Sequence, residues 1–137
     1  MASPVSSTSV QPFSRRHPHF THRHLRALLS QAGVEYVFLG DALGGRPDDP
    51  ASRRADGSLD MARRSRAEDF VAGVIRLLQL AEDATTAMMC AEEDPARCHR
   101  RGLVTPALLQ QQAAVLHIRG DGRLQVENGT DGQLPLF

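Results

Sequence analysis

The chain has 137 residues with sixteen cationic and sixteen acidic side chains, so its formal net charge is zero and no overall basic field attracts nucleic acid. Every cationic residue is arginine, which excludes Schiff-base catalysis by lysine and a phosphate-binding loop built on lysine. The length fits one domain, and no apolar run approaches the roughly 20 residues that a membrane helix needs.

Cysteine usage and the N-terminus bear on the cellular compartment. Two cysteines in a chain of this length are too few for a disulfide scaffold. The N-terminus lacks the apolar segment of a secretory signal, although its Ser- and Arg-rich, acid-free composition also occurs in transit peptides. Together these features favour reduced thiols in a bacterial, cytoplasmic protein.

The first 20 residues are rich in Ser, Pro and His and show little apolar periodicity. A short strand is expected around residues 5–13. Pro4 and Pro12 flank or interrupt this run, and proline cannot donate to a strand ladder. We therefore expect extended or edge structure there.

A helix, a strand and a long connection follow. The leucine stripe over residues 21–32 predicts a helix, and Gly33 stands at the position of a C-cap glycine. The β-rich run 34–39 predicts a strand. Residues 40–65 contain several glycines and prolines and read as a long loop, a class that is usually functional or disordered.

The second half repeats this alternation. A broad apolar face predicts a helix over 67–83, and a buried strand is expected over 86–91. A third helix is expected over 98–113, kinked or restarted by Pro106. The apolar run 115–118 predicts another strand.

Strands that alternate with helices predict a small α/β fold, specifically a three-layer, Rossmann-like domain with a mostly parallel sheet. The turn around residues 120–122 ends the expected domain, which spans 1–122, and residues 123–137 read as a flexible tail. In such sheets ligands bind beyond the carboxyl ends of strands, and Cys90 and an acidic loop lie at one such end.

The stretch CAEEDPARCHRR, residues 90–101, is the candidate functional centre. Cys98 falls near the first turn of the third expected helix, where unpaired amides favour a thiolate. Arg97, Arg100 and Arg101 add positive charge. Because the thiolate is the nucleophilic form of cysteine, we predict that Cys98 is a nucleophile or an anion anchor.

Other residues receive roles from their positions. Glu92 follows the strand where a general acid or base is often mounted, and His99 is adjacent to Cys98 in sequence. We predict Cys98, Glu92 and His99 as catalytic residues. The predicted substrate- or anion-binding residues are Arg100, Arg101, Cys90, Arg15, Arg16 and His117.

Each of these patterns also has a structural interpretation. Cys90 suits a buried strand, Cys98 a buried helix start, and Glu92 a solvated turn. The amides and arginines also suit an anion held without covalent chemistry. Cys90, Cys98, His99 and Glu92 offer metal-ligand types, but their spacing matches no standard zinc pattern, so we predict neither metal nor cofactor. Position 96 is alanine, which rules out the cysteine-phosphatase loop.

The string MMCAEEDPARCHRRGLV resembles the C-A-E…C-H-R signature of the domain-of-unknown-function 488 family. Residues 12–20 resemble the family's P-x-S-R-x-N-P-x-F segment, and residues 43–46 its L-G-G-R loop. The segment around Phe70 and the pair at 117–118 also fit. The resemblance covers about residues 10–120 and implies an α/β fold with a site at the C-A-E…C-H-R block. It implies no assigned activity.

The chain departs from this pattern near its start. Members of the family open with a strand carrying a T-I-G-H-S-like motif followed by D-V-R. The chain starts too late for the first motif, Ser9 stands where the arginine of D-V-R belongs, and His17 replaces an asparagine. We therefore expect an N-terminally incomplete domain with an exposed sheet edge.

The C-terminal pentapeptide QLPLF is the second informative string. It resembles the peptide by which bacterial repair and replication proteins dock on the sliding clamp, and the residues that would bind the clamp are Gln133, Leu134, Leu136 and Phe137. Apolar side chains of such peptides fill preformed pockets. An apolar end that folds back on the domain is the alternative.

Four arginines and no acidic residue precede Glu35, which suits contacts with phosphates or a solvated basic face. The sequence thus predicts a Cys/Glu-centred enzyme that acts on a nucleotide or nucleic acid in DNA repair. The alternative is a non-catalytic or degenerate binding module recruited to DNA through its tail. Neither function requires a membrane, and the oligomeric state stays open.

Overall fold

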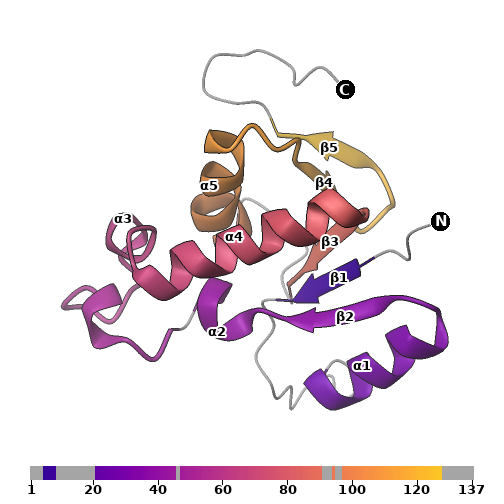
Figure 1. Cartoon of the computed structure of the whole chain (residues 1–137). Coiled ribbons are helices and arrows are strands. Elements are labelled where there is room, and N and C mark those ends of the chain that lie inside the picture. The colour runs from indigo at the N-terminus through magenta and orange to yellow at the C-terminus, as the bar shows by residue number, and fades with distance from the viewer. Residues whose placement is uncertain (1–4, 9–20, 46, 91–93, 95–96, 128–137) are drawn as a thin grey trace.

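A computed structural model shows a mixed α/β chain in which helices surround short strands (Figure 1). The structure describes residues 5–8, 21–45, 47–90, 94 and 97–127. Among these residues, no helix is both long enough and apolar enough to cross a membrane. The α/β class expected from the alternation of elements is therefore present.

Three strands form one sheet in the order β2-β1-β3. β1 (Val5–Thr8) pairs in parallel with β2 (Glu35–Phe38) on one side and with β3 (Thr86–Met89) on the other. The short strand expected around residues 5–13 is therefore present at residues 5–8, but the expected edge position is wrong because β1 lies between two partners. The strand occupies only the four residues after Pro4 and ends before Pro12, so neither proline interrupts its ladder.

The remaining two strands form a separate sheet. β4 (Leu116–Ile118) and β5 (Leu124–Val126) pair antiparallel, so the strands do not form the single, mostly parallel sheet expected from the sequence. β5 also lies within the segment expected to be a tail. The connecting turn contains Gly122 at φ +84°, a left-handed conformation that favours glycine, which allows the chain to reverse there.

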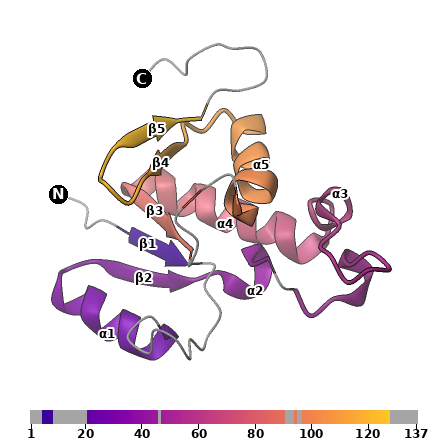
Figure 2. The same cartoon turned by 180° about the vertical axis from the view of Figure 1, so that it is seen from behind.

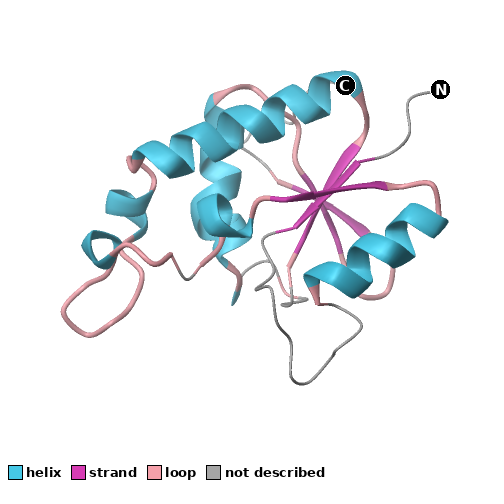
Figure 3. Ribbon diagram, turned by 60° about the horizontal axis from the view of Figure 1, so that its bottom comes forward, coloured by secondary structure: helices cyan, strands magenta, loops and turns pink. Residues whose placement is uncertain are grey.

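Helices cover both sides of the three-stranded sheet. α1 (His22–Gln31) lies on one side, and α4 (Glu68–Asp83) passes along the other (Figure 3). Gly33 has φ +74° and its amide bonds to the carbonyl of Ser30, so it ends α1 as predicted. The predicted helix over 67–83 is confirmed with its start one residue later.

Residues 40–65 are not the plain loop expected from their composition. They contain α2 (Gly40–Leu43), a 3-10 turn at Pro50–Ser52 and α3 (Met61–Arg64). The elements are too short for apolar periodicity to reveal them, and two of them are instead marked by aspartate caps. Asp49 accepts from the amide of Ala51 and Asp60 from that of Arg63.

The apolar core lies between α4 and the helical segment that follows the C-A-E…C-H-R block. Its buried residues are Leu43, Phe70, Val74, Leu77, Leu103, Val104, Leu108 and Val115. Gly73 on α4 lets α2 approach closely, because a Cβ there would lie 2.7 Å from the Cβ of Ala42. The core therefore fixes α2 and the site-bearing helix against one common element.

That site-bearing segment changes helix type along its length. A π-helical turn, η4 (Arg100–Val104), leads directly into α5 (Thr105–Gln110). Pro106 stands in the first turn of α5, a position at which proline is common. The change from the π-helical turn to the α-helix at Thr105 agrees with the restart expected at Pro106. Seen from behind, α5 and the β4–β5 hairpin lie on the same side of the molecule (Figure 2).

Candidate functional site

The two cysteines lie on different elements that meet at the end of β3. Cys90 follows the last residue of β3 directly, so the strand expected over 86–91 is present but ends at Met89. The expected burial is wrong, because Ala87 is exposed and Cys90 is only half-buried. Cys98 stands two residues before η4 and is 7% exposed. Leu103 and Val104 anchor η4 in the core with 2% and 1% exposure, which fixes the position of Cys98.

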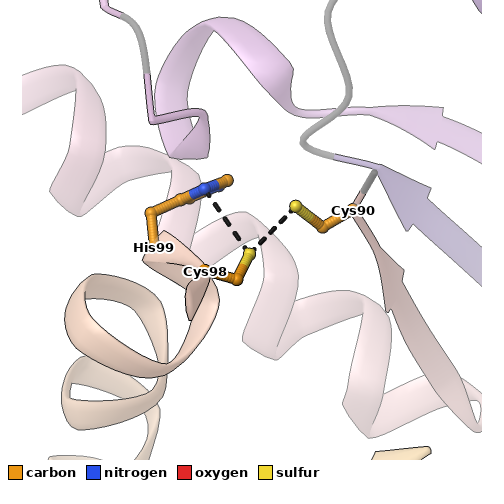
Figure 4. A group of neighbouring side chains, drawn as sticks. All are labelled: Cys90, Cys98 and His99. Atoms are coloured by element: carbon orange, nitrogen blue, oxygen red, sulfur yellow. Dashed lines mark hydrogen bonds between the residues drawn. The ribbon is translucent and has the colours of Figure 1, made fainter. Parts of the chain in front are cut away.

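The sulfur of Cys98 is the point on which the site's polar groups converge (Figure 4). Its Sγ lies 2.9 Å from the Sγ of Cys90 and 3.7 Å from Nδ1 of His99. The backbone N–H of Arg100 donates to the same sulfur at 3.4 Å, and the Nε–H of Arg100 donates at 3.3 Å. Neither Cys90 nor Cys98 is part of a disulfide bond.

These donors stabilise the ionised form of Cys98. The hydrogen bond between the Cys98 and Cys90 sulfurs is the largest contribution, and the hydrogen bonds with His99 and Arg100 add to it. Burial opposes them, but the donors prevail and lower the pKa of Cys98 to about 3. Cys98 is therefore a thiolate at neutral pH, the form in which cysteine acts as a nucleophile.

His99 occupies its place because Gly45 has no side chain. A Cβ at Gly45 would lie 3.0 Å from Nδ1 of His99, so the loop after α2 packs directly against the imidazole. Sequence adjacency to Cys98 does not predict this contact, since it depends on a loop more than fifty residues earlier. The L-G-G-R loop thereby becomes part of the site, with Arg46 outside the described residues.

A cavity of about 420 Å³ opens beside Cys98. We call it the cationic cavity. Its lining residues are Met61, Arg97, Cys98, His99, Arg101 and Gly102. Two guanidinium groups in one small cavity attract an anion, and the Cys98 sulfur is within reach of whatever binds there.

A larger groove of about 700 Å³ runs along β3 and β4. Cys90, Arg100 and His117 line it, whereas Cys98 does not. Arg100, predicted to bind a substrate anion, is therefore placed against the Cys98 sulfur and this groove, while Arg97 and Arg101 face the cationic cavity.

Cys90, Cys98 and His99 also offer one metal-ligand atom each within 4.8 Å of one another. The described residues supply only these three donors to the cluster. Moreover, the Arg100 guanidinium lies 3.3 Å from one of them, so a metal cation would meet a positive charge. The arrangement favours an anionic thiolate over a bound metal ion.

His117 has a different environment from the one expected. It lies on β4, is 5% exposed, and its Nε2 lies 2.8 Å from Oε2 of Glu127. The Nε of Arg101 lies 3.2 Å from the same carboxylate oxygen. Sequence reasoning missed Glu127, because it falls in the expected tail. The Glu127 carboxylate thus links the β4–β5 hairpin to η4, because it contacts His117 on β4 and Arg101 on η4.

Several predicted residues lie outside the part of the chain that the structure describes. They are Glu92, Arg15, Arg16, Gln133, Leu134, Leu136 and Phe137. Of the other predicted site residues, Cys90, Cys98, His99 and Arg100 are brought together around one sulfur. Arg101 is beside them on the cationic cavity, and His117 is paired elsewhere.

The comparison with protein families identifies one match. The family model described as domain of unknown function DUF488 matches residues 9–105. This range includes the whole C-A-E…C-H-R block and the loop at Gly45. No curated protein and no solved structure matches the chain.

Proposed function

Since the chain belongs to the DUF488 family, whose description names no reaction, we propose its function from the site: an enzyme in which the Cys98 thiolate attacks an electrophilic centre of a phosphate-bearing substrate, a nucleotide or nucleic acid. One observation carries the proposal. The Cys98 sulfur is hydrogen-bonded to Cys90, His99 and Arg100 while it faces the cationic cavity. A Rossmann-like assignment of the fold and a role in DNA repair belong to the same proposal.

Each residue has a distinct part in the proposed reaction. Cys98 is the nucleophile, and the Arg100 donors keep it ionised before the attack. His99 lies 3.7 Å from the sulfur and can transfer a proton to a leaving group beside it. Glu92 remains a predicted general acid or base, and its position is outside the described residues.

The substrate's anionic part is assigned to the cationic cavity. Arg97 is exposed and Arg101 is 45% exposed at its side chain, so both guanidinium groups reach a ligand that enters from solvent. Guanidinium groups bind phosphate through paired hydrogen bonds. Arg15 and Arg16 are proposed as further phosphate contacts on the sequence alone.

Alkylation with two reagents tests both parts of this proposal. Iodoacetate carries a negative charge and iodoacetamide does not, so the ratio of their rates at Cys98 reports the field of the cavity. We expect labelling at Cys98 before Cys90, and an iodoacetate preference higher than that of N-acetylcysteine, measured by peptide mass spectrometry. Arg97→Ala and Arg101→Ala should lower that preference toward the reference. Slow, charge-independent labelling of Cys98 would contradict the proposal.

The second candidate is the binding module recruited to DNA through the tail, and the QLPLF sequence favours it. We propose that Gln133, Leu134, Leu136 and Phe137 dock on the bacterial sliding clamp. Calorimetry with purified clamp tests this, with a chain that ends at residue 132 and a Leu136→Ala/Phe137→Ala variant. Unchanged affinity after either alteration would remove the tail from clamp binding.

We place the protein in the cytoplasm, because two free thiols this close together suit a reducing compartment. Localisation of a tagged full-length chain in bacterial cells tests this assignment.

A further inference from the structure

In the nucleophilic attack described above, Cys90 only stabilises the thiolate of Cys98 and forms no bond with the substrate. We propose that Cys90 and Cys98 form a reversible disulfide bond by exchange with a small anionic disulfide that enters the cationic cavity. This inference rests on the proposed function in one respect, namely that Cys98 is a reactive nucleophile. It adds a modification site and a class of reactant.

Distance is the first argument. The two sulfur atoms lie 2.9 Å apart, and a disulfide bond is about 2.05 Å long, so bond formation needs an approach of less than about 1 Å. Cys90 follows β3 directly and Cys98 is fixed by the buried start of the site-bearing helix. The two thiols therefore remain neighbours in the reduced protein, which gives the second thiol a high effective concentration.

The different surroundings of the two sulfurs are the second argument. Cys98 borders the cationic cavity, whereas Cys90 borders the groove along β3. A group attached to Cys98 from the cationic cavity leaves the groove side open. Cys90 can therefore approach the Cys98 sulfur without displacing that group first.

The exchange proceeds in two balanced steps. The Cys98 thiolate attacks one sulfur of R–S–S–R, forms the Cys98–S–S–R bond and releases R–S⁻. Cys90 then loses its proton, which the released thiolate takes up as R–SH, and the Cys90 sulfur attacks the Cys98 sulfur. The Cys90–Cys98 bond forms, the second R–S⁻ leaves, the protein has lost two electrons, and the disulfide has been reduced.

Charge selects the reactant. The arginines that line the cavity attract a disulfide with a net negative charge and repel one with a net positive charge. Glutathione disulfide is the anionic probe and cystamine is the cationic one. The quantity compared is the ratio of the rate with the anionic probe to the rate with the cationic probe. We expect this ratio to be at least about tenfold higher for the protein than for N-acetylcysteine.

The test follows the mass of the reduced full-length protein after addition of glutathione disulfide. The unaltered chain should lose two hydrogen atoms and carry no adduct. Cys90→Ser should stop with one glutathione on Cys98, because serine keeps a donor beside the sulfur but cannot resolve the adduct. Cys98→Ser should gain no adduct, and dithiothreitol should restore the unaltered chain.

Two outcomes would overturn the inference. One is an unaltered chain that accumulates the mixed disulfide as Cys90→Ser does, and the other is an adduct on Cys98→Ser at the unaltered rate. If Cys98→Ser does not fold, peptide mapping of the Cys90→Ser adduct decides the same point. Iodoacetamide labelling separates the two proposals. If Cys98 is alkylated rapidly but the mixed disulfide persists, Cys98 is a nucleophile and Cys90 does not resolve the mixed disulfide.

Discussion

The site around Cys98 and the cluster around Glu127 are built from similar side chains but are put together differently. At Glu127 the carboxylate accepts from Arg101 and lies within hydrogen-bond distance of the His117 imidazole, so these polar groups satisfy one another. At Cys98 the hydrogen-bonding groups all meet at one sulfur, which also faces a cavity. Polar groups that satisfy one another hold a structure together, whereas polar groups that converge on one reactive atom prepare it for a reaction.

The largest expected effect concerns the Cys98 site, and it is the pH dependence of Cys98 alkylation. With a pKa of about 3, Cys98 stays ionised as the pH falls from 8.5 to 5.5, and it loses its charge only as the pH falls through 3. An ordinary thiol with a pKa of about 8.5 loses roughly 500-fold in thiolate between pH 8.5 and pH 5.5. We expect a nearly flat rate profile for Cys98, measured by peptide mass spectrometry.

Cys90 supplies the matched controls for that profile. Cys90→Ala removes the largest cause of the lowered pKa, so the rate at pH 5.5 should fall relative to that at pH 8.5. Cys90→Ser keeps a donor and should change less. A flat profile in Cys90→Ala would show that Cys90 does not stabilise the thiolate.

Alteration of Glu127 should affect stability rather than reactivity. Glu127→Ala leaves the buried imidazole of His117 without its partner, which should cost about 1–3 kcal/mol in the free energy of unfolding. Glu127→Gln keeps an acceptor and should cost less. Urea denaturation gives the stability, and Cys98 alkylation should be unchanged. A large loss of Cys98 reactivity in Glu127→Gln would show that the Glu127 cluster also supports the Cys98 site.

Gly45→Ala should have a smaller effect, confined to the Cys98 site. The new methyl group would lie 3.0 Å from Nδ1 of His99, so the ring must shift at a cost of about 1 kcal/mol in stability. We expect a severalfold lower alkylation rate. The double variant Gly45→Ala/His99→Ala removes the ring and should respond no further than His99→Ala alone. A further loss in the double variant would place the effect elsewhere than on the imidazole.

Arg101 belongs to both clusters, and its removal should change stability least. Its side chain is 45% exposed, so the ion pair with Glu127 contributes less than about 1 kcal/mol. Arg101→Ala should therefore leave the urea midpoint nearly unchanged, with Arg123→Ala on the surface as a reference. A destabilisation as large as that of Glu127→Ala would make Arg101 part of the structural cluster only.

Elements with many local contacts could be predicted from the sequence, whereas long-range pairings could not. The apolar face of α4 and the glycine after α1 identify those helices within one or two residues. The central place of β1 depends on partners about thirty and eighty residues away, which no local pattern records. β5 was missed because a three-residue strand shows too little alternation to be recognised.

The same division applies to the site. The motif at residues 90–101 predicted Cys98, His99 and Arg100 as site residues, because their residue types suit anion chemistry at a helix start, but adjacency in sequence did not predict that their side chains meet. The contact between the two sulfurs depends on how the intervening loop returns, and sequence spacing does not determine that path. Glu127 reaches His117 because of the antiparallel register of the hairpin, in which the backbone N–H of Glu127 donates to the carbonyl of Val115.

The close approach of α4 to α2 at Gly73 has a consequence for the histidine. A Cβ at Gly73 would press on Ala42 and Leu43, the last residues of α2, two positions before the glycine that contacts His99. Two glycines, Gly73 and Gly45, therefore allow the close contacts that connect α4 through α2 to the imidazole of His99. A larger side chain at position 73 would displace α2 and the loop that contacts His99. We therefore expect a substitution between these two helices to change the reactivity of Cys98.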